Sequence, residues 1–168
     1  MKNLIVYRII TYILLFIAAF MSVGVFSSLL AALANPVALL PIFLLACVII
    51  YTYCSWRLLV RGIDKGIPLK PVVRDLIRIN GIISLVLGAI ILIQMLMVLV
   101  KPALLQDIMK QAKDAQPPGS DWNDTMLLSW TRFMVKFLLV YGAMLVVHPL
   151  LTLRLVKRFR DLFQEPAN

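Results

Sequence analysis

The stretch INGIISLVLGAIILIQMLMVLV, residues 79 to 100, decides the fold class of this chain. It runs for 22 residues without a charged side chain. About 20 apolar residues of α-helix cross the hydrocarbon core of a bilayer. Apolar segments of soluble proteins are shorter, or alternate with polar residues at a helical or strand period. The stretch therefore predicts a membrane-spanning helix.

Three more apolar runs repeat this pattern, and 62% of the 168 residues are hydrophobic. Soluble domains are closer to half apolar. Lipid forces each span to satisfy its backbone hydrogen bonds internally, so the spans should be helices. We expect one all-α transmembrane domain over residues 1–168, a four-helix bundle with spans at about 9–33, 36–56, 79–100 and 137–153.

Basic residues predict the orientation. Twelve Lys and Arg lie in the N-terminus, the 57–78 loop and the C-terminal tail, against five in the segments on the other side. By the positive-inside rule both termini are cytoplasmic. Because the net charge of +9 clusters beside apolar runs, we read it as topological and expect no nucleic-acid partner. Aromatic residues near the span ends agree with this orientation, on the inner side Tyr7, Tyr12, Tyr51, Tyr53 and Trp56, and on the outer side Trp122 and Trp130.

The N-terminus also resembles a secretory signal peptide. Lys2 precedes the apolar run, and Ala32-Leu33-Ala34 imitates a cleavage site. The run is longer than the 7 to 15 apolar residues of a typical signal peptide, which favours a retained first span. Cleavage stays open, and it would leave the later spans in the same orientation.

The connections have structure of their own. Gly62 and Gly66 can end the second helix, and Pro71 suits the first turn of the third. Asp121 and Asp124 indicate the start of the fourth helix, after the break QPPGS at 116–120. An apolar stripe predicts a short amphipathic helix in the outer loop, lying on the membrane surface or on the bundle: Leu104, Leu105, Ile108, Met109 and Ala112.

The basic inner loop has two interpretations. It can contact anionic lipid head groups, each basic residue contributing roughly 1 kcal/mol near the surface, or it can set the orientation alone. We expect mainly orientation with generic lipid contact. The candidate contacts are Arg57, Arg61, Lys65, Lys70, Arg74 and Arg78.

Polar and small residues inside the spans are the remaining candidates. A buried polar path or cluster is suggested by His148, Tyr141, Thr152, Ser84, Asn80 and Gln94, because polar groups in lipid are costly and often functional. A satisfied, structural histidine is the interpretation we favour for His148, beside proton relay, and Pro149 should kink its helix. Close helix packing is suggested by Gly24, Ser28, Ala32 and Gly88.

The sequence lacks the residues that several activities require. The four spans contain no Asp or Glu, which proton- and cation-coupled transporters usually place there. The chain has no Walker loop or nucleophile elbow, and zinc would need more ligands than His148 supplies. Cys47 and Cys54 lie in one apolar run and are interpreted as reduced packing residues. We expect no catalytic residue, cofactor or metal.

The segment WRLLVRGIDKGIPLKPVVRDLIRIN, residues 56–80, resembles the middle hairpin of small four-span bacterial membrane proteins of unknown function. In them a span ends in Arg/Leu, a glycine-containing cytoplasmic turn follows, and a basic helix leads into the next span. The resemblance implies a location in the bacterial inner membrane and transfers no site residue.

These observations favour a non-enzymatic membrane protein that acts by helix association, as an accessory or regulatory subunit or as a homo-oligomer. The alternative is a small oligomeric channel or transporter with Gln94, Tyr141 and His148 along its path. An enzyme acting on a lipid or a quinone is the third and least supported hypothesis.

Overall fold

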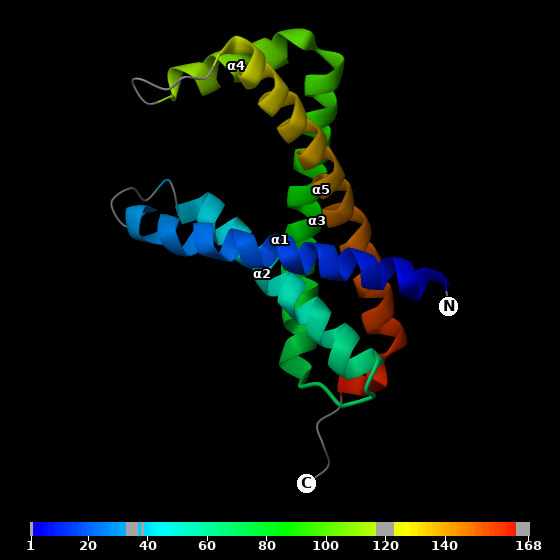
Figure 1. Ribbon diagram of the computed structural model, residues 1–168. Coiled ribbons are helices and arrows are strands. Elements are labelled where there is room, and N and C mark those ends of the chain that lie inside the picture. The colour runs from blue at the N-terminus through cyan, green and yellow to red at the C-terminus, as the bar shows by residue number, and fades with distance from the viewer. Residues whose placement is uncertain (1, 33–36, 38, 117–122, 164–168) are drawn as a thin grey trace. The chain divides into compact units, whose positions relative to one another are not determined.

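The computed structural model describes residues 2–32, 37, 39–116 and 123–163 (Figure 1). These residues form helices and no strand, which confirms the predicted all-α class. In chain order the elements are α1 (Lys2–Ala32), α2 (Leu39–Arg57), the π-helix η2 (Leu58–Ile63), α3 (Pro71–Val100), α4 (Pro102–Asp114), α5 (Asp124–Arg158) and the 3-10 helix η3 (Arg160–Phe163).

Within the described residues, four helical segments are long and apolar enough to cross a membrane: Leu4–Leu29, Leu39–Ile63, Pro71–Val100 and Asp124–Arg158. The third and fourth segments contain the predicted spans 79–100 and 137–153 and begin earlier, whereas the first two overlap the predicted spans 9–33 and 36–56 without containing them. The third helix begins at Pro71, because proline is tolerated in a first turn. The fourth begins at Asp124, where the Asn123 side chain accepts a hydrogen bond from the Met126 amide at 2.8 Å. Asn123 is therefore the cap of that helix.

Some predicted features fall outside the described residues. They are the Leu33 and Ala34 positions of the possible cleavage site, the break at 34–36, the prolines of QPPGS, and Asp121.

The chain divides into two compact units. The first unit comprises residues 1–87 and 144–168, with α1, α2, η2, the start of α3, the end of α5 and η3. The second unit comprises residues 88–143, with the rest of α3, α4 and the start of α5.

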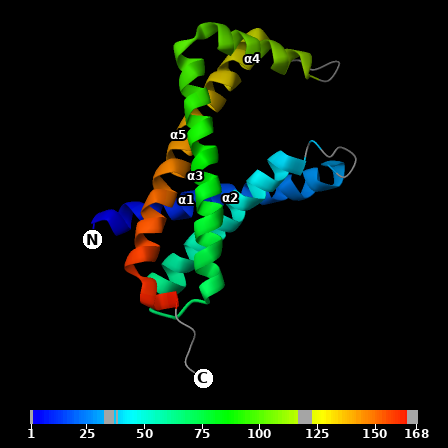
Figure 2. The ribbon, with the colours of Figure 1, turned by 180° about the vertical axis from the view of Figure 1, so that it is seen from behind.

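In the first unit, α1 and α2 form a hairpin and lie side by side in both views (Figures 1 and 2). The loop after η2 turns at Gly66, whose φ of +65° lies in the left-handed region that glycine adopts readily. The loop then reaches η3, where the Leu69 amide donates to the Leu162 carbonyl at 2.7 Å. An apolar cluster fills this end of the unit: Tyr51, Cys54, Leu58, Leu69, Val73, Ile77, Val156 and Phe163.

In the second unit, α4 is amphipathic, as predicted. Its apolar stripe is half-buried, whereas Gln106, Asp107, Lys110 and Lys113 are exposed. α3 and α5 approach closely at Gly142, where an added Cβ would lie 3.2 Å from the Gly88 carbonyl oxygen and from the Leu92 nitrogen.

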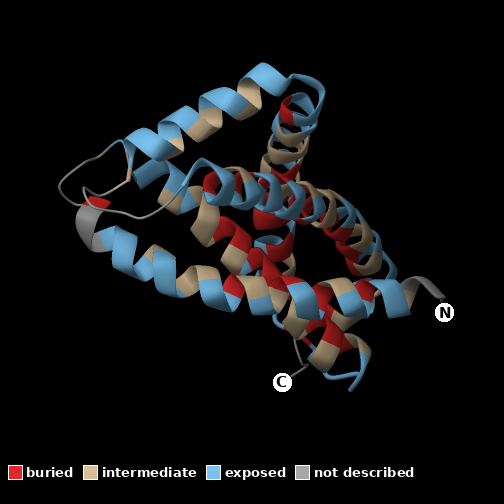
Figure 3. Cartoon of the chain, turned by 45° about the horizontal axis from the view of Figure 1, so that its top comes forward, coloured by how far each residue is buried: buried red, intermediate tan, exposed pale blue. Residues whose placement is uncertain are grey.

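Along α1, α2, α3 and α5, buried residues alternate with exposed ones (Figure 3), and many of the exposed residues are large and apolar. On α1, for example, Phe16, Phe20 and Phe26 are 75% exposed or more. Such a surface is far more apolar than the surface of a soluble monomer.

Candidate functional site

The candidate site is a buried polar cluster in the first unit, which we call the His148 network. Its six side chains are completely buried, with 0% exposure each: Tyr7, Thr11, Tyr51, Ser55, His148 and Thr152. Each of α1, α2 and α5 supplies two of them, four residues apart. Residues four apart lie on one helix face, so each helix presents an aromatic or imidazole ring with a hydroxyl one turn later.

His148 is the centre of the network. Its Nε2 lies 2.8 Å from the Thr11 hydroxyl of α1. Its Nδ1 lies 2.7 Å from the Tyr51 hydroxyl of α2. The Tyr7 ring stacks on the imidazole with centroids 4.8 Å apart and planes 5° apart. One side chain of α5 thus contacts both of the other helices through rings and hydrogen bonds.

Hydroxyl groups complete the network. The Tyr51 hydroxyl lies 2.8 Å from the Thr152 hydroxyl. The Tyr7 hydroxyl lies 2.6 Å from the Ser55 hydroxyl, which in turn is 3.4 Å from that of Thr152. These contacts form a continuous chain of polar atoms across α1, α2 and α5.

The heavy atoms accommodate either neutral tautomer of His148. With the proton on Nε2, the ring donates to Thr11, which itself donates to the Tyr7 carbonyl at 2.7 Å. Nδ1 then accepts from Tyr51. With the proton on Nδ1, the ring donates to Tyr51 and Tyr51 donates to Thr152. Thr152 then donates to the His148 carbonyl at 2.8 Å, and Thr11 donates to Nε2. In both arrangements, each N–H and O–H of the network donates to an acceptor.

This arrangement limits the chemistry of the network. No ring nitrogen of His148 is left for a metal, and the described residues contain no cluster of three or more His, Cys, Asp or Glu. The network has no carboxylate, and burying an unpaired charge is costly. The geometry therefore suits a neutral imidazole that links three helices.

The sequence candidates are distributed between the two units. His148 and Thr152 belong to the network. Asn80 and Ser84 are buried in the first unit, but they bond to the carbonyls of their own helix, Leu76 at 3.0 Å and Asn80 at 2.7 Å. Gln94 is exposed in the second unit. Tyr141, also in the second unit, stacks on Phe137 with centroids 6.2 Å apart.

Four network residues were not proposed from the sequence as site residues: Tyr7, Thr11, Tyr51 and Ser55. Tyr7 and Tyr51 were assigned to an interfacial aromatic belt. That position fits Tyr12 and Tyr53, which are 48% and 51% exposed, but not two completely buried rings. The repeated pairing of a ring with a hydroxyl four residues later was the available signal.

The predicted packing residues differ in their surroundings. Gly24 and Ser28 are exposed on α1, and a Cβ added to Gly24 would meet no atom within 4 Å. Ala32 is buried. Gly142 lies close to the backbone of Gly88. The sequence predicted Gly88 as a packing residue but not Gly142. A further glycine, Gly81, lies against the Tyr51 ring, which is 3.2 Å from its Cβ position.

The basic residues of the inner loop are exposed or half-buried. Arg74 lies 3.2 Å from Asp75, and Asp64 is bonded to Arg8 of α1 at 2.6 Å. Arg57 differs from these residues because its Nε is buried and has no hydrogen-bond partner within the described part of the chain.

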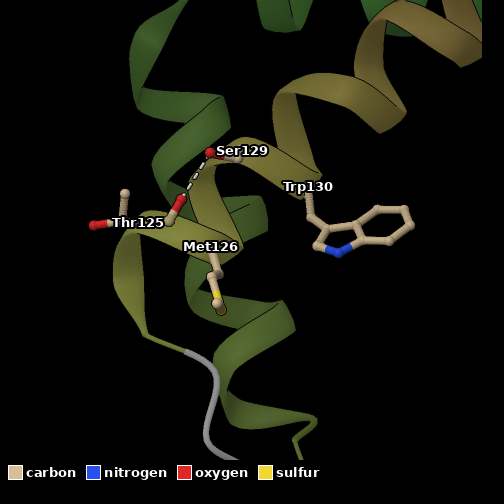
Figure 4. A pocket seen from close by; sticks show the side chains of 4 residues that line it. All are labelled: Thr125, Met126, Ser129 and Trp130. Carbon is tan, nitrogen blue, oxygen red and sulfur yellow. Dashed lines mark hydrogen bonds between the residues drawn. The ribbon is translucent and has the colours of Figure 1, made fainter.

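The second unit has a surface hollow of about 300 Å³ at the start of α5, lined by Thr125, Met126, Ser129 and Trp130 (Figure 4). The Ser129 hydroxyl donates a hydrogen bond to the Thr125 carbonyl at 2.9 Å. Beside the hollow, Lys113 of α4 forms an ion pair with Asp124 of α5, with the Lys113 Nζ 2.7 Å from the Asp124 Oδ1. The hydrogen bond and charge of Asp124 raise the pKa of Lys113. This hollow is shallow and presents no reactive group.

Comparison with protein-family models, curated proteins and solved structures yields no match to this chain. The resemblance of residues 56–80 to bacterial four-span proteins therefore stays a prediction.

Proposed function

We propose that the chain is a multi-pass protein of a bacterial inner membrane, crossing it four times with both termini in the cytoplasm. Four apolar helices and their exposed apolar faces support insertion. The excess of Lys and Arg in the N-terminus, the 57–78 loop and the tail supports the orientation.

Within the membrane we propose a non-enzymatic role in helix association, either with a second copy or with another membrane protein. The observation that carries this proposal is the open face of α1 at Gly24 and Ser28. Small residues four apart let another helix approach closely, and in lipid such packing drives association. The internal bonding of the His148 network supports the absence of catalysis, because it leaves no free nucleophile there.

The test is native mass spectrometry of the protein extracted with its lipids. We expect an oligomer or a complex that Gly24→Leu and Ser28→Leu each weaken, because a leucine side chain fills the space for the incoming helix. Val23→Leu is the matched control, since Val23 is 70% exposed on the same helix and is already large. An assembly unchanged in the Gly24→Leu, Ser28→Leu double variant would remove α1 as the contact face.

A second candidate function is proton movement, in a small channel or transporter. It is favoured by one observation, the unbroken chain of polar atoms through the His148 network. Passage of one proton would move the Tyr51 proton onto Nδ1 and the Nε2 proton onto Thr11, with one proton entering at Thr152 and another leaving from Thr11, and it would convert one tautomer into the other. Proton flux into proteoliposomes decides between the two functions.

A further inference from the structure

The helix α4 has an apolar stripe that the chain does not fully cover. The stripe is half-buried, and none of the 13 residues of this helix, all of them described, is buried. The N-cap residue, Lys101, makes no side-chain hydrogen bond to the first turn. A helix of this length is marginal in water without support from a surface that covers its apolar face. The stripe therefore calls for a further apolar surface. Its residues are Leu104, Leu105, Ile108, Met109 and Ala112.

The end of α3 sets the level at which α4 begins. From Ile79 to Val100 this helix carries 22 residues without a charge. They span about 33 Å at 1.5 Å per residue, and the hydrocarbon core of a bilayer is about 30 Å thick. An inserted α3 therefore extends from Arg78 at the inner head groups to Lys101 at the outer ones. Because α4 begins at Pro102, its first turn lies at the outer boundary.

The start of α5 gives a second measure of this level within the same unit. Val100 follows Gly88 by twelve residues, and Trp130 precedes Gly142 by twelve. Counted from the close approach of the two glycines, both residues lie about 18 Å along their helices, towards the same end of the pair (Figures 1 and 2). Trp130 is 47% exposed. A partly exposed tryptophan at the end of an apolar stretch is typical of the membrane interface.

An ion pair holds the other end of α4 near this level. The Lys113 Nζ lies 2.7 Å from the Asp124 Oδ1. Asp124 precedes Trp130 by six residues, about 9 Å along α5. The helix α4 is about 20 Å long, so a rise of this size leaves it closer to flat than to upright. Both views show α4 turning away from the end of α3 (Figures 1 and 2).

We propose that α4 is an interfacial helix whose apolar stripe inserts into the outer leaflet of the bilayer. An amphipathic helix lies in the interface plane with its apolar face at the boundary between head groups and acyl chains. Three Lys and three Asp balance along α4 and at its two ends, so the contact depends on apolar burial and not on anionic lipid. These charged residues are Lys101, Lys110, Lys113, Asp107, Asp114 and Asp124. The inference rests on the proposed membrane insertion and adds a second mode of lipid contact to it.

The variants place a spin label on each face of α4 in the full chain. The background carries Cys47→Ala and Cys54→Ala, because both native cysteines are free thiols. Met109→Cys and Leu105→Cys put the label on the stripe, one turn apart. Lys110→Cys is the matched control, because it is the next residue of the same helix and is exposed on the opposite face.

The experiment compares how two relaxing agents reach each label in proteoliposomes of phosphatidylcholine. Oxygen concentrates in the acyl chains, whereas a water-soluble nickel chelate stays outside them. We expect the ratio of oxygen access to nickel access to be several-fold higher at Met109→Cys and Leu105→Cys than at Lys110→Cys. Equal nickel access at all three positions would show a stripe in water and overturn the proposal. Low access of both agents at the two stripe positions would show that protein covers the stripe, and would overturn it as well.

Two further arms separate this inference from its premise. Val86→Cys reports the span itself, because Val86 is 53% exposed near the middle of α3. Nickel access at Val86→Cys equal to that at Lys110→Cys would refute membrane insertion. Oxygen access at Val86→Cys without oxygen access at the stripe would refute the interfacial helix alone. The ratio at Met109→Cys should stay the same when phosphatidylglycerol is added. Lipid contact that appears only with this anionic lipid would overturn the apolar basis of the proposal.

Discussion

The two units hold their helices together in different ways. In the first unit, α1, α2 and α5 are linked by six buried polar side chains around His148. In the second unit, α3 and α5 meet backbone to backbone at Gly88 and Gly142, and aromatic rings contact one another along α5, edge to face at Trp130 and Phe133 and stacked from Phe133 to Tyr141. One unit depends on hydrogen bonds and the other on close apolar packing.

If the chain is inserted in a bilayer as proposed, the two units solve the same physical problem in different ways. Lipid tails are as apolar as leucine, so burying apolar surface gives helices in a bilayer little reason to associate. Hydrogen bonds between spans add modest energy but fix which faces meet. Glycine contacts instead gain dispersion energy by bringing backbones together. The first unit should therefore respond to loss of polar groups and the second to added volume.

The largest effect is expected from His148→Leu. Leucine removes both ring hydrogen bonds and the stacking with Tyr7, which together should lower the free energy of unfolding by about 3 kcal/mol. The measurement is unfolding in mixed micelles by added SDS, followed by circular dichroism. Leu150→Ala, at a 46% exposed position of the same helix, is the control and should change stability little.

The same variant tests the proton-moving alternative. If the network is a structural link, wild type and His148→Leu proteoliposomes show the same background proton leak. Flux that is present in wild type and absent in a folded His148→Leu protein would replace the association role with transport. Stability equal to wild type would show that the network does not hold the first unit together.

The sequence predicted the helices better than their contacts. Hydropathy identified all four long helices because a span needs a minimum apolar length regardless of its neighbours. His148 was visible as the only histidine in an apolar run. Tyr7 and Tyr51 were misassigned because a tyrosine near a span end suits either an interface or a buried hydrogen bond. Which one it joins depends on how the helices face, and that is not local in sequence.

The glycines also show that the sequence predicts helices better than the contacts between them. Gly24 and Gly88 were both predicted to pack; Gly88 lies under Gly142, whereas Gly24 has no neighbour in its own chain within 4 Å, so its packing stays a prediction. The π-helix at Leu58–Ile63 was not predicted either. A glycine or a helix irregularity acquires its role from the element that packs against it.

A smaller effect is expected from Gly142→Leu. The added side chain meets two backbone atoms at 3.2 Å, the Gly88 oxygen and the Leu92 nitrogen, so α3 and α5 must separate. Overpacking of this kind costs about 2 kcal/mol. Val140→Leu is the control for the same SDS titration, since Val140 is 57% exposed on the same helix. Equal stability of the two variants would contradict the close approach in the second unit.

The smallest effect is expected from Tyr7→Phe, which keeps the ring stacked on His148 and removes the hydroxyl 2.6 Å from Ser55. One buried hydrogen bond between helices should contribute about 1 kcal/mol to the free energy of unfolding. Tyr12→Phe removes the same atom from a 48% exposed ring and should leave that free energy unchanged. If the two variants unfold at the same SDS concentration, the hydroxyl chain contributes no stability, and ring packing around His148 alone holds the first unit. If Tyr7→Phe unfolds earlier, the polar atoms themselves distinguish the first unit from the second.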